Sequence, residues 1–149
     1  MAQPMIEQLT IPLDGCNKYC MYPILHADVW AVYKKMQSLR WLAEEIDFSQ
    51  DIRHWNALSE SERHFLKMII SYFAASDGLV NANLAERFMC EIEWSNVKAV
   101  LTEQMSMECV HAEVYSLLIE KYVSDQAEKS MLFNAMETIP AISKKAGWT

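Results

Sequence analysis

The sequence predicts an all-α protein, and three observations carry this prediction. Apolar residues recur at helical spacing along two stretches of about thirty residues each. The 149-residue chain has only 3 Gly and 4 Pro, which leaves little material for the tight turns of β-hairpins. Its 10 Met, 5 Trp and 6 Tyr suit long helices with bulky contact faces. We therefore expect two long antiparallel helices with shorter ones, an incomplete helical bundle.

Size and charge restrict the classes of partner. With 149 residues, 52% of them hydrophobic, the chain has enough apolar material for one globular domain. Its net charge of -7 and the absence of a basic cluster argue against a nucleic-acid partner. No apolar stretch approaches the roughly 18 residues that span a bilayer, and the N-terminus lacks a secretory signal pattern. We expect a cytoplasmic protein that binds neither nucleic acid nor membrane.

The first helix is predicted after an irregular arm. Residues 1–24 form this arm because Pro and Gly interrupt every periodic pattern there, and residues 25–149 form the domain. From His26 to about Leu39, apolar residues recur at helical spacing, which predicts a helix. A short connection follows, and we expect Trp41 to anchor it.

The first long helix begins at a capping box. Ser59 and Glu62 have the Ser-x-x-Glu spacing of this motif, and the apolar stripe that follows continues to Phe88. Gly78 interrupts the stripe next to Asp77, at a cost of about 1 kcal/mol relative to alanine. We expect either a neighbouring backbone that packs closely against Gly78 or a local distortion of the helix there.

A second long helix completes a helical hairpin. The apolar pattern predicts a helix from about Ser95 to Tyr122, so the hairpin apex falls near Ile92-Glu93. A shorter helix is predicted from Ser124 and ends before Pro140, because proline cannot continue a helix. Two long and two shorter helices are too few to close a bundle around a buried metal site and also cover every apolar stripe.

Three polar residues of the hairpin have the spacing of a metal site. Glu108 and His111 are three residues apart and therefore share one face of the second long helix. Asp77 lies about sixteen residues before the apex and Glu108 about fifteen after it, so both are about 23 Å from the turn. We expect the three side chains to meet, in the ligand layout of di-iron and di-manganese carboxylate bundles. Oxygen ligands with one imidazole suit iron or manganese better than structural zinc.

The pattern also has a purely structural interpretation. Glu-x-x-His pairs are frequent by chance on helices, whereas Asp77 in an apolar stretch requires a partner or a cation. The chain has no second Glu-x-x-His, so the proposed site is half of a di-metal site. Tyr115 lies one turn beyond His111 on the same face, where it is either a core residue or a phenol that a metal-oxygen species can oxidise.

The remaining metal-binding residue types show weaker patterns. The four cysteines, Cys16, Cys20, Cys90 and Cys109, include no Cys-x-x-Cys pair and are interpreted as reduced structural thiols. A terminal metal or redox role of Cys16 and Cys20 is the alternative. Glu60 and His64 have helical spacing but lie near a helix start, which favours a surface pair.

Several longer strings resemble one enzyme family. From about residue 20 to 148, in order, the chain resembles the small, radical-generating subunit of class I ribonucleotide reductase. The resemblance is carried by these strings: Trp30-Ala-Val-Tyr-Lys-Lys, Trp41-Leu-Ala-Glu-Glu-Ile-Asp, Tyr72-Phe-Ala-Ala-Ser-Asp-Gly-Leu-Val-Asn-Ala-Asn-Leu, Glu108-Cys-Val-His-Ala-Glu-Val-Tyr-Ser-Leu-Leu-Ile and Leu132-Phe-Asn-Ala-Met-Glu-Thr-Ile-Pro. It implies a ferritin-like bundle.

The resemblance assigns a role to each candidate residue. It implies that Asp77, Glu108 and His111 are ligands of the first iron of a di-iron centre, with manganese as a possible substitute. It implies that Tyr115 holds the stable radical and that Trp41 belongs to the electron path toward the large catalytic subunit. In this family, the radical starts the reduction of ribonucleotides to deoxyribonucleotides in the large subunit.

The chain departs from the family in its length. Family members continue with two further Glu ligands, a second Glu-x-x-His, an aspartate that bonds the counterpart of Trp41, and a tail that docks on the large subunit. We expect this chain to be an N-terminal half that requires a separate C-terminal half and cannot generate a radical alone. The alternatives are a homodimer that completes a di-metal site without radical chemistry and a metal-free chain that regulates another subunit.

Overall fold

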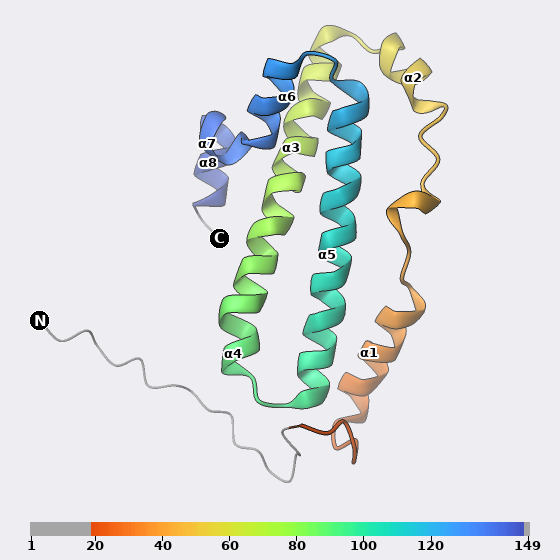
Figure 1. Ribbon diagram of the computed structural model, residues 1–149, viewed down its shortest axis with the longest axis vertical. Coiled ribbons are helices and arrows are strands. Elements are labelled where there is room, and N and C mark those ends of the chain that lie inside the picture. Colours follow the sequence, from red (N-terminus) through yellow and green to blue (C-terminus); the bar gives the residue numbers. More distant parts are fainter. Residues whose placement is uncertain (1–18, 148–149) are drawn as a thin grey trace, which may run out of the picture. The chain divides into compact units, whose positions relative to one another are not determined.

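Helices account for all the regular secondary structure of residues 19–147, the part of the chain that this computed structural model describes (Figure 1). The all-α prediction is therefore confirmed. Most of the expected N-terminal arm, including Cys16, lies outside the described residues. None of the described helices is long and apolar enough to cross a membrane.

The chain divides into two compact units. The first consists of the chain up to Arg40 together with Ala82–Met105, and the second consists of Trp41–Asn81 together with the chain from Ser106 onward. The two long helices, α3 (Glu60–Asn83) and α5 (Ser95–Tyr122), each contribute residues to both units.

The first unit contains α1 (Ala27–Ser38), which matches the predicted helix from His26 to Leu39 within a residue at each end. Residues 19–26 before it form no helix or strand. The unit also holds the hairpin apex at residues 92–94, where the sequence predicts it. Leu84 and Ala99 are its buried apolar side chains, and Asn96 and Glu103 are its buried polar ones.

The end of the first long helix is less regular than predicted. The stripe predicts one helix to Phe88, whereas α3 ends at Asn83 and is followed by a π-helical turn, η2 (Leu84–Phe88), and by the short α4 (Met89–Glu91). The chain stays helical across these residues, so the predicted length of the helical segment is right. The wider turn changes the direction of the side chains that follow it.

An ion pair joins Arg40, two residues after α1, to the buried Glu103 of α5 within the first unit. Arg40 donates from Nε and Nη2 to the two carboxylate oxygens of Glu103, whose side chain is only 5% exposed. These hydrogen bonds are the main reason why the pKa of Glu103 lies below its ordinary value of 4.5. A buried carboxylate requires this kind of partner, because burial alone disfavours its charge.

The lowered pKa of Glu103 predicts a loss of stability in acid. The folded state holds Glu103 charged, so its contribution is present above pH 4.5 and is lost as the pH falls through its lower folded pKa. Urea unfolding at a series of pH values below 4.5 should show the free energy of unfolding falling, and less steeply for Glu103→Gln. Parallel curves for the two proteins would contradict this assignment.

The second unit contains a short helix that was not predicted from the sequence. A single 3-10 turn, η1 (Ala43–Glu45), follows Trp41, and α2 (Asp51–Ala57) precedes the long helix. Seven residues are too few for a helix that is stable alone or for a clear period. Tertiary contacts hold α2, because Trp55 stacks on the Tyr122 ring and Tyr122 donates a hydrogen bond to Asp51.

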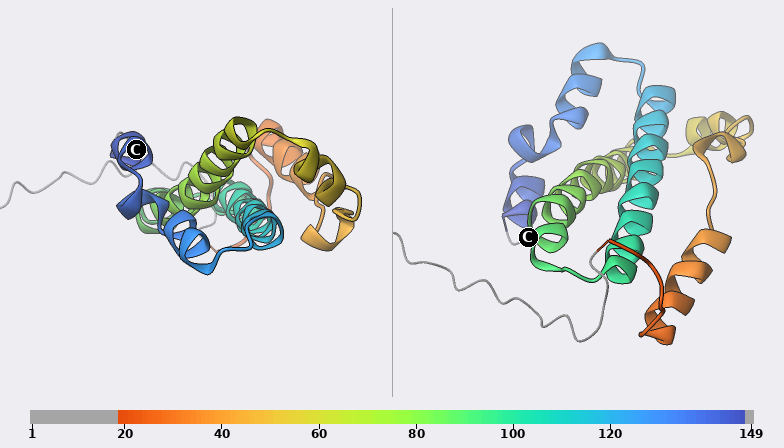
Figure 2. Two further views of the ribbon diagram at one scale, coloured as in Figure 1. Left: turned by 90° about the horizontal axis from the view of Figure 1, so that it is seen from above. Right: turned by 60° about the horizontal axis from the view of Figure 1, so that its bottom comes forward.

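The long helices run side by side in the second unit and carry its core (Figure 2). The predicted capping box at the start of α3 is confirmed: the Glu62 amide donates to Ser59 Oγ at 3.3 Å, and the Ser59 amide donates to Glu62 Oε2 at 2.8 Å. The core consists of three buried residues and the partly buried side chains packed on them: Ile119, Val123, Leu132, Met68, Ile70, Ala74 and Ile139.

The segment after α5 returns along α3 as three helices, α6 (Gln126–Phe133), α7 (Ala135–Thr138) and α8 (Pro140–Ala146) (Figure 2). The predicted start at Ser124 is wrong by two residues: α6 begins at Gln126, because Asp125 is the N-cap and accepts from the Glu128 amide at 2.7 Å. Pro140 ends the predicted helix but also begins α8. Proline is favoured at the first helical position, where its missing N–H is not needed.

The expectation about Gly78 is wrong in both of its forms. A Cβ built on Gly78 meets nothing within 4 Å among the described residues, so no neighbouring backbone packs there. The helix is also regular at this position, since the π-turn begins only at Leu84. Within the described structure, Gly78 therefore carries the helical penalty of glycine without a packing reason.

Gly78→Ala should stabilise the isolated chain. Alanine loses less backbone freedom than glycine on forming a helix, and the space for its methyl group is open, so we expect a gain of about 1 kcal/mol. Urea unfolding of the two proteins measures the difference. An unchanged or lower stability would indicate that another group approaches this position.

Candidate metal centre

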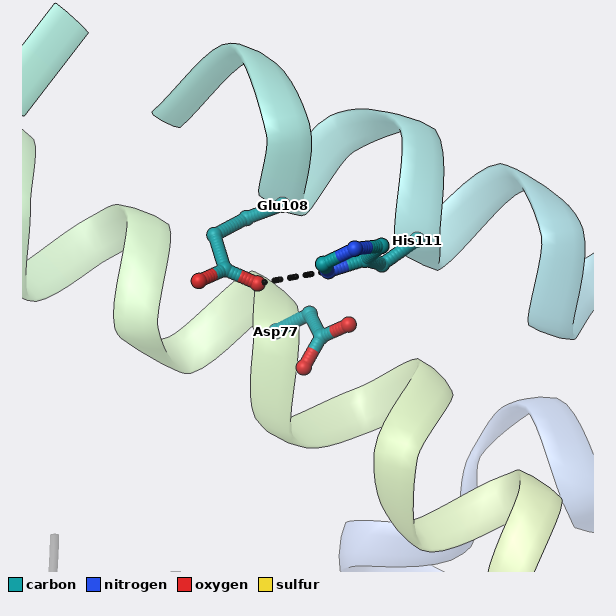
Figure 3. A group of neighbouring side chains, drawn as sticks. All are labelled: Asp77, Glu108 and His111. Carbon is teal, nitrogen blue, oxygen red and sulfur yellow. Dashed lines mark hydrogen bonds and ion pairs between the residues drawn. The ribbon is translucent and has the colours of Figure 1, made fainter. Parts of the chain in front are cut away.

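Three side chains from the two long helices converge in the second unit. Asp77 comes from α3, and Glu108 and His111 come from α5 (Figure 3). One ligand atom of each residue lies within 4.8 Å of the corresponding atoms of the other two. Glu108 Oε2 is 3.2 Å from His111 Nδ1. The structure thus brings together the three residues that the hairpin geometry places level with one another.

The local fold explains this convergence. The i and i+3 positions place Glu108 and His111 on one face of α5, and that face is directed toward Asp77 on the antiparallel α3. All three residues are partly buried: the side chains of Glu108 and His111 are 18% and 38% exposed. The group is therefore sheltered by the two helices and still open on one side.

The electrostatics of the group favour a bound cation. The pKa of Asp77 is raised above its ordinary value, first by burial and then by the nearby carboxylate of Glu108. His111 and a hydrogen bond from Ser76 act in the opposite direction but do not cancel these effects. A cation between the carboxylates would remove their repulsion and compensate for burial of their charges.

Tyr115 lies one turn beyond His111 on α5. Its ring stacks on Phe73 of α3 with the ring centroids 5.5 Å apart. The pKa of its phenol is raised, mainly by burial and further by the charges of Asp77 and Glu108. The phenol therefore stays protonated at neutral pH and lies within the electrostatic influence of the two carboxylates.

The structure also places Trp41 against the candidate site. Its ring centroid is 5.7 Å from that of His111, and the two ring planes are tilted by 36°. Trp41 lies in the segment before η1, so local periodicity could not predict this contact. The other described histidines lie elsewhere: His26 stacks on Trp94 in the first unit, and His54 and His64 are exposed.

Two neighbours of the three candidate ligands were not predicted from the sequence. Phe73 contacts Tyr115, and the Asn81 amide donates to Cys109 Sγ at 3.4 Å, beside Glu108. Phe73 and Asn81 lie four residues before and four residues after Asp77, which places all three on one face of α3. This spacing was the signal that could have identified them.

The donor set fits a metal of the iron or manganese type. Two carboxylates and one imidazole nitrogen form an oxygen-rich set of donor atoms, which suits these metals. Three protein ligands would leave open coordination positions on a single metal ion. Among the described residues, no cysteine belongs to the group: Cys20, Cys90 and Cys109 are free thiols outside it.

Comparison with protein families identifies the chain. The family model described as "Ribonucleotide reductase, small chain" matches residues 18–149. The chain belongs to this family. It is 44% identical to ribonucleoside-diphosphate reductase subunit M2 of Rattus norvegicus over 146 residues, which cover 98% of this chain and 37% of the rat protein. The chain thus spans much less than half the length of this small-subunit relative.

Solved structures share the fold. The Rnr4 homodimer of Saccharomyces cerevisiae matches with a TM-score of 0.73 at 29% identity, over 85% of this chain and 40% of that one. The dimanganese(II)-NrdF of Streptococcus sanguinis matches with a TM-score of 0.74 at 23% identity, over 83% of this chain and 44% of that one. The ferritin-like fold class expected for the small-chain family is therefore confirmed.

Proposed function

We propose that this chain supplies one half of the di-metal site and the oxidisable tyrosine of a ribonucleotide reductase small subunit. The convergence of Asp77, Glu108 and His111 within 4.8 Å carries the proposal. Tyr115, which lies one turn beyond His111 on the same face of α5 and stacks on Phe73, is the proposed oxidisable tyrosine. Residues 25–149 then act as one part of a ferritin-like domain whose other ligands lie outside this sequence.

The three ligands would hold one metal of the pair. Iron is our first choice and manganese the second, and the matching NrdF of Streptococcus sanguinis is a dimanganese(II) protein. When bound and reduced, a di-metal centre supplies an oxidant by its reaction with oxygen. His111 would bind through Nδ1, the nitrogen that faces Glu108.

Tyr115 is suited to be oxidised at this position. Because its raised pKa keeps the phenol protonated, loss of an electron must be accompanied by loss of the proton. The ring packs on Phe73, which excludes water from one of its faces. We propose that the oxidised tyrosine persists because its surroundings are apolar apart from the carboxylate cluster.

Trp41 would connect the site with a second protein. Its ring contact with His111 provides a path for an electron from the surface of the unit to the metal ligands. We propose the large subunit of ribonucleotide reductase as the partner at the far end of this path. The radical would there start the reduction of ribonucleotides to deoxyribonucleotides, in the cytoplasm.

An apolar groove beside the site supports the need for a partner. Within the second unit, α3 and α8 border a groove of about 350 Å³. Phe65 is 61% exposed there, and Phe73, which contacts Tyr115, is 41% exposed. Large exposed aromatic side chains typically mark an interaction surface. We propose that the C-terminal half of a small subunit covers this groove and brings the remaining ligands.

A second copy of the chain is the alternative partner. Two copies related by a two-fold axis would combine two Asp77, two Glu108 and two His111, which matches the ligand inventory of a complete di-metal bundle. The matching Rnr4 of Saccharomyces cerevisiae is a homodimer, which favours this second candidate. Such an assembly would bind metal without radical chemistry.

The test measures the mass of the protein in solution and the number of metal ions bound per chain. We would measure both for the chain alone and for the chain mixed with the C-terminal remainder of the rat subunit M2, after adding ferrous iron and oxygen. A one-to-one complex with two metals and a tyrosyl radical signal is the expected result. A folded, iron-loaded complex without a radical would contradict the proposal, whereas a metal-loaded homodimer without a radical would support the alternative.

A further inference from the structure

Besides Tyr115 and Phe73, a second pair of stacked aromatic residues lies at the C-terminal end of α5. Tyr122, the last residue of α5, stacks on Trp55 of α2 with centroids 4.7 Å apart and planes 15° apart. Tyr122 also donates a hydrogen bond of 2.9 Å to Asp51 Oδ2. Trp55 is 8% exposed. An indole, a phenol and a carboxylate are therefore held together in one cluster.

The carboxylate gives Tyr122 a proton acceptor that is already in place. Burial and the contact with Asp51 raise the pKa of Tyr122 to about 12, so the phenol does not ionise at neutral pH. Oxidation of such a phenol must remove the electron and the proton together. The hydrogen bond to Asp51 provides the route for the proton.

Tyr122 and Tyr115 lie on the same face of α5. They are seven residues apart in the sequence, which is about two turns, about 10.5 Å of rise and a difference in direction of only about 20°. The two phenols are thus neighbours along one rigid helix, close enough for an electron to pass between them.

The second pair opens to the surface. A cleft of about 190 Å³ adjoins it, with Asp51, His54 and Tyr122 among the lining residues. His54 is exposed at this cleft. A small soluble one-electron reductant could therefore reach the Tyr122 end of the path, whereas Tyr115 is partly covered by Phe73.

We propose that Trp55 and Tyr122 form a second redox site through which the oxidising equivalent leaves Tyr115. The proposal rests on the proposed role of Tyr115. In the transfer, Tyr122 gives an electron to the Tyr115 phenoxyl and its proton to Asp51. Tyr115 takes up a proton from solvent and Asp51 releases one, so charge and protons balance. A one-electron reductant at the cleft then gives an electron to the Tyr122 phenoxyl through the stacked Trp55 ring, and Tyr122 takes up a proton from solvent.

Tyr72 provides a matched comparison. Like Tyr115, Tyr72 is partly buried and contacts Phe73; the centroids of the Tyr72 and Phe73 rings are 5.5 Å apart. The ammonium group of Lys145 lies 5.2 Å from the centroid of the Tyr72 ring, and a positive charge there opposes the loss of an electron. No carboxylate among residues 19–147 accepts a hydrogen bond from its hydroxyl.

The first experiment tests the redox site without any metal. A ruthenium polypyridyl photo-oxidant is coordinated to His54 of the full chain, and phenoxyl formation is followed by transient absorption after a flash. We expect a phenoxyl signal that Tyr122→Phe removes, that Asp51→Asn slows several-fold and that Tyr72→Phe leaves unchanged. An equal signal in Tyr122→Phe and in the unchanged chain would overturn the assignment of Tyr122.

The second experiment tests the transfer in the iron-loaded complex with the C-terminal part of the small subunit. Electron paramagnetic resonance should show that the Tyr115 radical decays several-fold more slowly in Tyr122→Phe and in Trp55→Phe, but not in Tyr72→Phe. Equal decay in all four proteins would overturn the transfer. A complex that forms no radical at all overturns the proposed function and the transfer step together, while the photo-oxidation result still decides the redox site.

Discussion

Tyr115→Phe is expected to abolish the tyrosyl radical of the assembled complex and to leave the number of bound metals unchanged. Phenylalanine keeps the ring that stacks on Phe73 but has no O–H group to lose. None of the three proposed ligands is altered, and removal of the hydroxyl leaves the cluster of Asp77, Glu108 and His111 in place. The expected effect is complete loss of the tyrosyl radical signal and no change in the number of bound metal ions.

Two measurements on the same samples check this expectation. Metal analysis gives metals per chain, and electron paramagnetic resonance after addition of ferrous iron and oxygen gives the radical yield. Tyr72→Phe is the matched control, since Tyr72 also contacts Phe73 and lies outside the cluster. A full radical yield in Tyr115→Phe would assign the radical to another residue.

Glu108→Gln is expected to remove the metal itself. An amide has no charge and is a poor ligand for iron or manganese, so only Asp77 and His111 would remain from this chain. Changes in residues that only support a ligand typically lower metal affinity by about 10- to 100-fold, and we expect a larger loss here. The radical should disappear as a consequence.

The same change should not destabilise the metal-free chain. Glu108 contributes to the raised pKa of Asp77, which means that the two carboxylates repel each other when no cation is present. Removal of one charge relieves this repulsion, so the free energy of unfolding should stay constant or rise. A mainly structural role of Glu108 predicts the opposite sign, since its contact with His111 would be lost.

Titration with ferrous iron under anaerobic conditions measures the affinity, and urea unfolding measures the stability. Glu113→Gln is the control, because Glu113 is exposed on the same helix and lies outside the cluster. Equal iron affinity in Glu108→Gln and Glu113→Gln would refute the metal assignment.

The regular elements of this protein could be predicted because their signals are local. The apolar period and the Ser59–Glu62 capping box placed α3, and the period alone placed α1 and α5 within a residue or two. A helix has fixed rise and rotation per residue, so the positions of Asp77 and Glu108 along their helices follow from counting. Their approach within 4.8 Å together with His111 required only the hairpin and its apex.

The elements that were not predicted depend on contacts between distant residues. The seven-residue α2 is held by Trp55 and Asp51 against Tyr122, about seventy residues later, and no local period reveals such a contact. The π-turn of residues 84–88 lies inside an apolar stripe whose period predicts an ordinary α-helix. Proline at position 140 ends one helix and begins another, and only the fold shows the second.

The candidate site likewise has one part that the sequence predicts and another that only the fold shows. The sequence by itself determined the helix faces and hence the levels of Asp77, Glu108, His111 and Tyr115, because helical geometry converts spacing into position. Only the tertiary structure decided that Trp41 lies against His111, since the segment before η1 has no regular geometry that fixes its path. Packing of the chain also decided that Gly78 faces open space, because an empty neighbourhood depends on every other segment.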